Sequence, residues 1–356
     1  MTQSGERHLT DQFRGAALGL AAAALFGLSA PVAKLLLGQI APVLLAGLLY
    51  LGAAVGLWVH RAIARPTREA PLGRSDVWRL GFVVLSGGIA GPVLMLLGLA
   101  RVTGLTGSLL LNLEAPFTVL LAVLLFREHL GRYAAIAAVL IVSGAFVLKL
   151  EPGSLGADTA GVLLLAAACA CWAVDNNLTQ RLSLKDPFAI VRVKTLVAGL
   201  ANATLGLVVT AGALPPWQFV LGALVLGSLS YGVSVVLDAF ALRLIGAARE
   251  AAYFATAPFV GALASVVLLG DGLRWHDGLA MAMMALGVGF LLRERHSHEH
   301  GHDELEHEHL HEHDDHHRHE HGPEVPLGEP HSHAHRHAPL VHDHPHVPDA
   351  HHRHRH

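Results

Sequence analysis

Ten stretches of mainly apolar residues, each about 20 residues long, follow one another with short joints through the first 292 residues of the chain. A helix of roughly 20 apolar residues is long enough to cross the hydrocarbon core of a bilayer. In lipid, the backbone polar groups must be satisfied within a helix or a closed barrel. The sequence therefore predicts an all-α integral membrane protein with ten transmembrane helices. The expected spans are 14–37, 40–60, 78–98, 103–125, 131–150, 159–180, 187–211, 217–241, 246–270 and 275–292.

The end of the chain differs in composition from this apolar body. Residues 296–356 contain 23 of the 27 histidines and 13 of the 28 acidic residues, but only 4 of the 25 Lys and Arg residues. The body therefore carries a net charge of +6, and charged residues make up only 15% of the chain, against about 25% in ordinary soluble domains. The only two cysteines, Cys169 and Cys171, lie in an apolar stretch and are interpreted as packing residues. This composition excludes a soluble globular enzyme and a disulfide-stabilised secreted domain.

The distribution of Lys and Arg over the joints predicts which side of the membrane each joint faces. The joints after the second, fourth, sixth and eighth spans carry 12 Lys and Arg residues, whereas the opposite joints carry three. We therefore predict that both termini are cytoplasmic, in a bacterial inner or plasma membrane. Arg192 and Lys194 are interpreted as part of this cytoplasmic anchoring.

The two halves of the body are related in sequence. Residues 100–117, ARVTGLTGSLLLNLEAPF, align with residues 242–259, LRLIGAAREAAYFATAPF, and share an Arg, a Gly and an Ala-Pro-Phe triplet at equal spacing. Because five spans is an odd number, the second set must enter the membrane from the opposite side. Such inverted repeats are typical of secondary transporters with a site near the bilayer midplane. The expected organisation is a cytoplasmic N-terminal segment (1–13), two five-helix repeats (14–150 and 159–292) and a His-rich tail (296–356).

The stretch LNLEAPFTVLLAVLLFREHL (111–130) resembles the helix that ends the half-repeat of EamA-type members of the drug/metabolite transporter (DMT) superfamily. The second half, AYFATAPFVGALASVVLLGDGL (252–273), keeps Pro258 but has Thr256 in place of Glu114. The resemblance covers nearly all of the body and leaves the tail outside the family pattern. It implies a transporter of organic solutes such as amino acids, nucleosides, sugars or drugs.

Glu114 is an ionisable residue about halfway along an apolar span. A charged side chain at this depth costs roughly 2.5–3.5 kcal/mol on insertion scales and usually faces an interior cavity. We interpret Glu114 as a proton or cation coupling site, with a helix–helix hydrogen bond as the alternative. Asn112 and Tyr253 lie near Pro116 and Pro258 on the repeated helices and are included in the candidate site.

Asp175, Asn176 and Asn177 form the densest polar cluster in any span, and Trp172 lies one turn before Asn176. An aromatic ring beside an amide and a carboxylate suits an amphipathic organic substrate. The alternative for this cluster is hydrogen bonding between helices. We therefore place these four residues in the candidate binding site.

Two further pairs of charged residues lie near the inner ends of the eighth and ninth spans. They are Asp238 with Arg243, and Arg249 with Glu250. At this depth, ion pairs or side chains that extend toward the headgroups are the expected interpretation, so these residues are left out of the candidate site.

The tail carries His at alternate positions, interleaved with Glu and Asp. A segment with so few apolar residues is expected to be disordered. Neutral imidazoles suit Zn, Cu, Ni and Co, and alternate residues of an extended chain face the same side. The predicted metal-binding residues are His296, His298, His300, His302, His307, His309, His311, His313, His331, His333, His335 and His337.

Two functions follow from these features. The first is a secondary transporter of small organic metabolites or drugs, an exporter coupled to protons, with a metal-binding cytoplasmic tail. The alternative is a divalent transition-metal (Zn, Ni or Co) transporter, or a membrane metal sensor, that uses the tail. No G-x-x-x-x-G-K-[ST] or H-E-x-x-H motif is present, so we expect neither ATP-driven pumping nor enzymatic activity.

The expected partners are the lipid bilayer, a small-molecule substrate and divalent metal ions. A second copy of the chain, in a homodimer, is a further expected partner. No nucleic acid and no required cofactor are expected.

Overall fold

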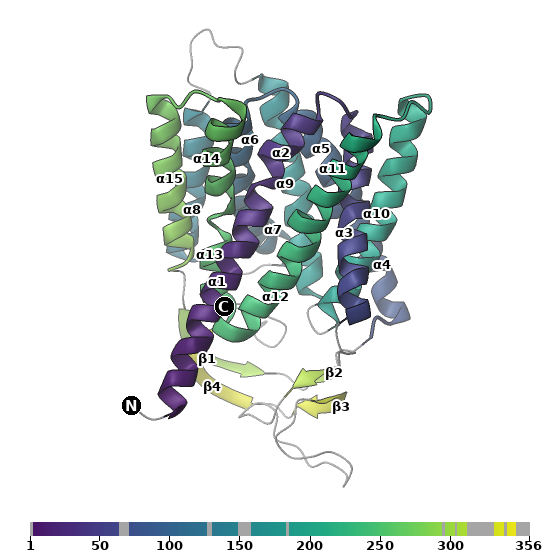
Figure 1. Cartoon of the computed structure of the whole chain (residues 1–356). Coiled ribbons are helices and arrows are strands. Elements are labelled where there is room, and N and C mark those ends of the chain that lie inside the picture. Colours follow the sequence, from purple (N-terminus) through teal and green to yellow (C-terminus); the bar gives the residue numbers. More distant parts are fainter. Residues whose placement is uncertain are drawn as a thin grey trace.

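The computed structural model is a bundle of helices with four short strands beneath one end (Figure 1). All statements on structure below concern the residues that it describes. These are residues 3–63, 71–126, 130–148, 158–182, 185–293, 296–302, 305–311, 331–337 and 340–346.

The first half of the bundle contains eight α-helices, two short 3₁₀ helices and one π-helix. They are α1 (Gln3–Gly27), α2 (Ser29–Leu36), α3 (Pro42–Ile63), the 3₁₀ helix η1 (Arg74–Asp76), α4 (Val77–Val83), the π-helix η2 (Val84–Ala90), α5 (Gly91–Leu99), α6 (Gly104–Leu110), the 3₁₀ helix η3 (Leu111–Leu113), α7 (Glu114–Phe126) and α8 (Arg132–Val147).

The second half contains seven α-helices and one π-helix. They are α9 (Thr159–Gln180), α10 (Pro187–Val209), α11 (Trp217–Gly227), the π-helix η4 (Ser228–Val233), α12 (Ser234–Ile245), α13 (Ala247–Phe254), α14 (Ala257–Leu269) and α15 (Trp275–Leu291).

Eight helical stretches of the described chain are long and apolar enough to cross a membrane, which confirms an integral membrane protein. The two other expected spans correspond to the apolar helices α8 and α15, with 16 and 17 residues. A 16-residue helix is about 24 Å long, shorter than the hydrocarbon core of roughly 30 Å. The predicted count of ten spans is therefore confirmed for eight of them by length and composition.

The same interruptions occur in the same order in both halves. A π-helix divides the third expected span of each half, as η2 and η4. The fourth expected span is also divided in each half, by η3 between α6 and α7 and by a turn between α13 and α14. Pro116 and Pro258 lie in the first turn of the following helix, where a missing N–H is tolerated. Divided helices leave backbone polar groups free inside the bundle, as in many transporter sites.

The contacts between helices also pair corresponding spans of the two halves. Helix α3 packs on α10 and α8 packs on α15, which pairs the second and the fifth expected spans of the two halves. Helix α1 packs on α12 and α14, while α9 packs on α5 and α7. Each contact of the first helix of one half thus has a counterpart for the first helix of the other half.

Glycines allow the central helices to approach closely. A Cβ atom at Gly52 would overlap the main chain of α11 at Leu224, and one at Gly227 would overlap the main chain of α3 at Leu49. Both glycines face a neighbouring backbone, as expected for helix contacts in membranes.

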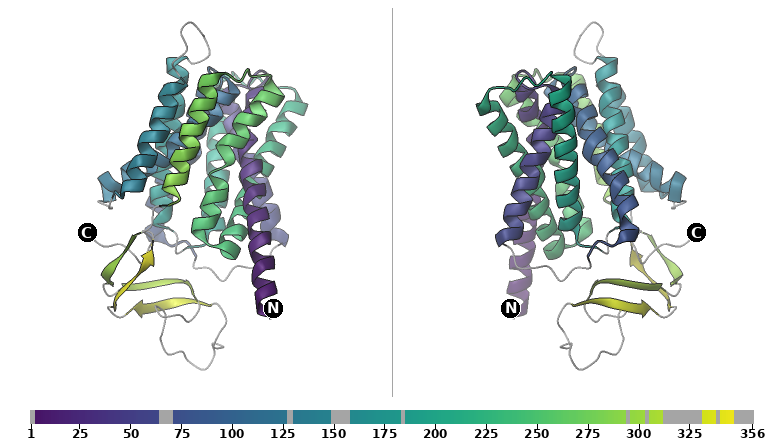
Figure 2. Two further views of the ribbon diagram at one scale, coloured as in Figure 1. Left: turned by 90° about the vertical axis from the view of Figure 1, so that its left-hand side faces the viewer. Right: turned by 90° about the vertical axis from the view of Figure 1, so that its right-hand side faces the viewer.

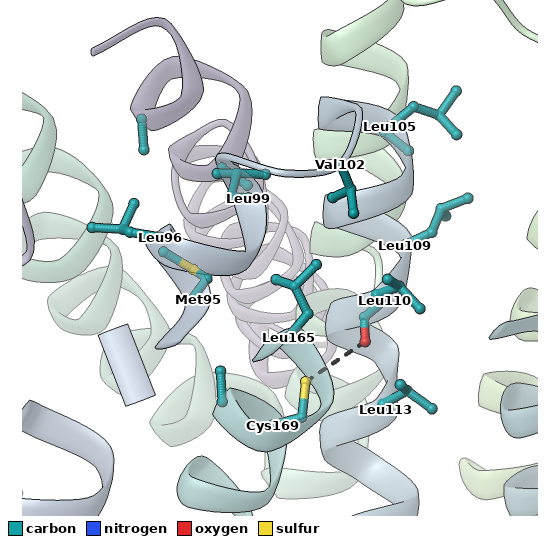
Figure 3. Close-up of a cluster of buried hydrophobic side chains, with 14 of the residues drawn as sticks. Met95, Leu96, Leu99, Val102, Leu105, Leu109, Leu110, Leu113, Leu165 and Cys169 are labelled. Atoms are coloured by element: carbon teal, nitrogen blue, oxygen red, sulfur yellow. Dashed lines mark hydrogen bonds between the residues drawn. The ribbon is translucent and has the colours of Figure 1, made fainter. Parts of the chain in front are cut away.

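Apolar side chains fill the end of the bundle far from the N-terminus, which Figure 1 marks. Figure 3 shows part of this cluster. Leu96, Leu99, Leu109 and Leu165 are completely or almost completely buried between α5, α6 and α9. Cys169 belongs to this cluster, and its Sγ lies 3.6 Å from the carbonyl oxygen of Leu110. Both cysteines are free thiols, as expected for packing residues.

The tail contains four strands where we expected disorder. They are β1 (His296–His302), β2 (Leu305–His311), β3 (His331–His337) and β4 (Leu340–His346). Strand β1 pairs with β4 and β2 pairs with β3, both antiparallel. The alternation of His with other residues has a period of two, which matches the period of a strand. The side views show these strands at the end of the bundle where α1 begins (Figure 2).

Candidate functional site

A cavity of about 610 Å³ lies among the first, fourth, sixth, eighth, ninth and tenth expected spans. Its polar lining side chains include Asn112, Glu114, Asn176, Asp238 and Glu250. The lining extends to the C-terminal end of α15, so the cavity occupies the half of the bundle near the N-terminus of α1 (Figure 1). The remaining lining residues are Phe26, Leu111, Ala115, Thr118, Val119, Trp172, Ala251, Phe254, Ala255, Ala257, Pro258, Val288, Leu291 and Leu292.

Glu114 is the first residue of α7 and lines the cavity where the fourth span is divided. Its Oε1 accepts a hydrogen bond of 2.7 Å from Nδ2 of Asn176 on α9. Its carbonyl oxygen accepts a hydrogen bond of 2.9 Å from Oγ1 of Thr118. The structure thus brings together two predicted site residues that lie 62 positions apart in the sequence.

Aromatic side chains form one wall of the cavity. Phe26 and Phe254 line it with ring centroids 5.2 Å apart. Trp172 also lines it, and its Nε1 donates a hydrogen bond of 3.1 Å to the carbonyl oxygen of Gly87. The hydroxyl group of Tyr50 donates to the same oxygen at 2.9 Å. Gly87 belongs to the π-helix η2, so the irregular backbone holds the tryptophan at the cavity wall.

Asp238 on α12 and Glu250 on α13 also line the cavity. The sequence interpretation as ion pairs or as extended side chains at the membrane surface left them outside the candidate site, whereas the structure places both at the cavity. Their carboxyl groups interact with each other. Oδ1 of Asp238 and Oε1 of Glu250 are buried and accept no hydrogen bond from any residue that the structure describes.

Asp175 and Asn177 were predicted site residues, but neither lines the cavity. Asp175 is buried and forms an ion pair with Lys194, and Oγ1 of Thr179 donates to it at 3.0 Å. Asn177 is buried and donates to the carbonyl oxygens of Thr118 at 3.1 Å and Ala173 at 2.8 Å. Both therefore join helices, which was the alternative interpretation of this cluster.

Of the other two predicted residues, Asn112 lines the cavity and Tyr253 does not. Asn112 lines the cavity and donates 2.9 Å to the carbonyl oxygen of Leu109. Tyr253 is absent from the lining and packs beside Gly19 of α1. Of the seven predicted substrate residues, Asn112, Glu114, Trp172 and Asn176 share the cavity.

Arg192 and Lys194 are not the surface anchors that the charge distribution suggested. Arg192 is buried and pairs with Asp186 at 3.2 Å. Asp186 in turn accepts hydrogen bonds from the first N–H groups of α10. Lys194 pairs with Asp175 inside the bundle. The charge of each residue is balanced by an acidic neighbour rather than by the headgroup region.

Polar contacts connect the joints at the opposite end of the bundle. Nζ of Lys34 donates to the carbonyl oxygens of Leu99 at 2.7 Å and Val102 at 2.5 Å. Asp271 accepts a hydrogen bond of 2.9 Å from the N–H of Leu105 at the start of α6. These contacts close the loop between α5 and α6 over the apolar cluster.

The joint before α9 carries a further ion pair at this end. Arg101 donates to Asp158 at 2.9 Å. Together with the N–H of Ala160, this guanidinium holds the pKa of the Asp158 carboxyl below its ordinary value.

Of the twelve predicted metal-binding histidines, eleven lie on strands β1, β2 and β3, and His313 is outside the described residues. The register places His298 opposite His344, and His300 opposite His342. In the other pair, His307, His309 and His311 lie opposite His335, His333 and His331. Among the residues searched, which are the described ones, no group of three or more His, Cys, Asp and Glu is placed to hold a metal ion.

Known proteins provide a comparison for this arrangement. The chain matches the EamA-like transporter family over residues 13–150 and 159–293. It is 31% identical over 280 residues to an uncharacterized transporter of Methanothermobacter thermautotrophicus, covering 74% of this chain and 81% of the relative. It is 30% identical over 175 residues to the threonine/homoserine exporter RhtA of Salmonella typhimurium, covering 49% of this chain and 59% of the exporter.

The fold is also found in a solved crystal structure that is 20% identical in sequence. The two superpose with a TM-score of 0.56, covering 78% of this chain and 96% of the other. The two proteins therefore share the fold. With both halves of the body matched, the chain belongs to the EamA-like transporter family of the drug/metabolite transporter superfamily, a family of membrane transporters.

Proposed function

We propose that this protein is a secondary exporter of small organic metabolites or drugs, coupled to protons through Glu114. The single observation that carries this proposal is the 610 Å³ cavity, which joins an intramembrane carboxyl group to an aromatic wall. A volume of this size accommodates a small organic molecule, because ligand pockets range from about 300 to 1,000 Å³. The name of the relative RhtA, an exporter of two amino acids, supports organic cargo and the outward direction.

The distribution of packing supports an alternating-access cycle. Apolar side chains and the contacts of Lys34 and Asp271 fill the end away from the N-terminus, whereas the cavity occupies the other half. A second state requires these contacts to separate and the cavity end to close. The π-helices and the divided spans are sites where helix pieces can change direction. Rocking of related halves around a shared site is the usual motion of transporters built from inverted repeats.

The transported class is tested by flux in proteoliposomes, with organic solutes and divalent metals measured side by side. We expect counterflow of at least one organic solute, and acceleration of its movement by an opposing pH gradient. Empty liposomes give the passive baseline. Movement of Zn or Ni without movement of any organic solute would replace this proposal by metal transport.

We propose that both termini face the cytoplasm of a bacterial inner membrane. Support comes from the Lys and Arg bias of the joints and from the position of the strands near the start of α1 (Figure 1). Reporter fusions at His296 and within the joint at Ala213 should give cytoplasmic and external signals respectively. Signals from one and the same side would contradict the ten-span topology.

The tail supports a second candidate function, metal binding. The register places histidines of β1 opposite those of β4, and histidines of β2 opposite those of β3. Directly opposite residues of an antiparallel pair have Cα atoms about 4.5–5.5 Å apart. We propose that the tail binds Zn, Ni, Co or Cu in the cytoplasm. Metal transport or metal sensing is the corresponding alternative for the whole protein.

A further inference from the structure

We infer that the cavity selects organic cations, namely amines with an apolar body and no carboxylate. This inference rests on the proposed function and specifies its substrate class. It also assigns Asp238 and Glu250 to substrate selection.

The charges at the cavity wall have one sign. Glu114, Asp238 and Glu250 come from three different helices and line the same volume, whereas no Lys, Arg or His is among the described lining residues. The nearby Lys194 is paired with Asp175. A cationic solute therefore finds opposite charges in the cavity, and an anionic group finds no cationic side chain along the wall.

Two of the acids at the wall, Asp238 and Glu250, also interact with each other, which favours a cation in the cavity. Oδ1 of Asp238 and Oε1 of Glu250 are buried and accept no hydrogen bond from the described residues. The carboxyl groups of these two residues interact directly, so their negative charges repel each other unless a proton or a cation compensates them. An ammonium group carries three donors and a positive charge, and in the cavity it can supply that compensation in place of a proton.

The aromatic wall suits the rest of such a solute. Phe26, Trp172 and Phe254 line the cavity beside these acids. Aromatic faces attract cations and bury apolar groups at the same time. A zwitterionic amino acid would place its carboxylate in a cavity wall that already carries three carboxyl groups. The cavity is therefore better suited to 2-phenylethylamine than to phenylalanine.

The inference is tested by calorimetric binding to the full chain in nanodiscs. The probes are 2-phenylethylamine, its neutral isostere 2-phenylethanol, and phenylalanine. We expect binding of the amine at least about tenfold tighter than that of either other probe, the ratio expected for one charge-assisted hydrogen bond. The same order should hold for competition against flux in proteoliposomes.

Variants assign the effect to the two acids. Asp238→Asn and Glu250→Gln should each weaken amine binding by about tenfold and leave binding of the neutral probe within about twofold. The matched control is Asp158→Asn, an exposed acid at the other end of the bundle, which should leave amine binding unchanged.

Two results would overturn the inference. One is equal or tighter binding of the alcohol or of phenylalanine by the wild-type protein, a measurement that does not depend on the folding of any variant. The other is unchanged selectivity in both acid variants. Flux of neutral or zwitterionic solutes would refute the amine preference and keep the transporter proposal, whereas flux of metal alone would refute both.

Discussion

Replacing Glu114 by Gln is expected to lower proton-driven efflux by at least about tenfold, because the variant has no ionisable group at this position of the cavity. Gln keeps an oxygen at the same position, so the bond from Asn176 can still form and the fold should be preserved. The dependence of flux on an imposed pH gradient should disappear, while exchange of substrate in the absence of a gradient should be affected less.

The measurement is flux in proteoliposomes at a series of pH values, with insertion checked by reconstitution yield and thermal unfolding. Asp158→Asn serves as the matched control because it also removes one carboxylate, but at an exposed joint. An unchanged rate and pH profile in Glu114→Gln would leave Glu114 with a structural role only. Loss of flux in the control as well would indicate a general effect of charge rather than a coupling site.

Glu114 could be found from the sequence because a carboxylate halfway along an apolar helix is costly unless it faces a cavity. Asp238 and Glu250 could not be found in the same way. They lie close to Arg243 and Arg249 near the ends of their spans, where charged side chains commonly reach the headgroups. Whether these two acids face inward depends on how α12 and α13 pack against α1.

In the triplet Asp175, Asn176 and Asn177, too, the sequence does not show which side chain faces the cavity. Successive residues of an α-helix point about 100° apart, so three neighbours cannot all face one cavity. Asn176 faces Glu114, whereas Asp175 faces Lys194 and Asn177 faces the backbone of α7. Composition identified the polar helix correctly, but the direction of each side chain depends on contacts with α7 and α10.

The fold was more predictable than the site. The apolar stretches predicted the helical bundle, and the Arg-Gly-Ala-Pro-Phe spacing predicted that its two halves are related. The division of helices at corresponding positions of both halves was found only in the structure. The π-helices η2 and η4 could not be predicted, because their residues are as apolar and as small as those of the surrounding α-helices. In the tail, composition predicted disorder, whereas the alternation of residues has the period of the strands that the structure contains.

Truncation after Arg295 is expected to remove most of the Zn and Ni binding while leaving the helical bundle folded and inserted. The tail holds 23 of the 27 histidines, and its strands pair with one another, β1 with β4 and β2 with β3. The bundle has its own buried core, which extends across α2, α3, α5, α6, α8 and α9. Its thermal unfolding should therefore change little.

Calorimetric titration with Zn and Ni and flux of an organic solute, on the full and truncated chains, separate the two roles of the tail. A full-length chain with all 23 His residues of the tail replaced by Asn is a matched variant that keeps the length of the tail. It should lose metal binding to a similar extent. Unfolding of the truncated chain, or metal stoichiometry that survives both changes, would contradict this account of residues 296–356.

The effect of the truncation on transport identifies the cargo. If the cavity moves organic solutes, basal flux should persist without the tail, and any response of the rate to added Zn should disappear. If the protein moves metal, the loss should be largest at low metal concentration. Under that condition, capture by the histidines raises the local concentration of metal near the cavity end of the bundle, where the strands lie (Figure 1).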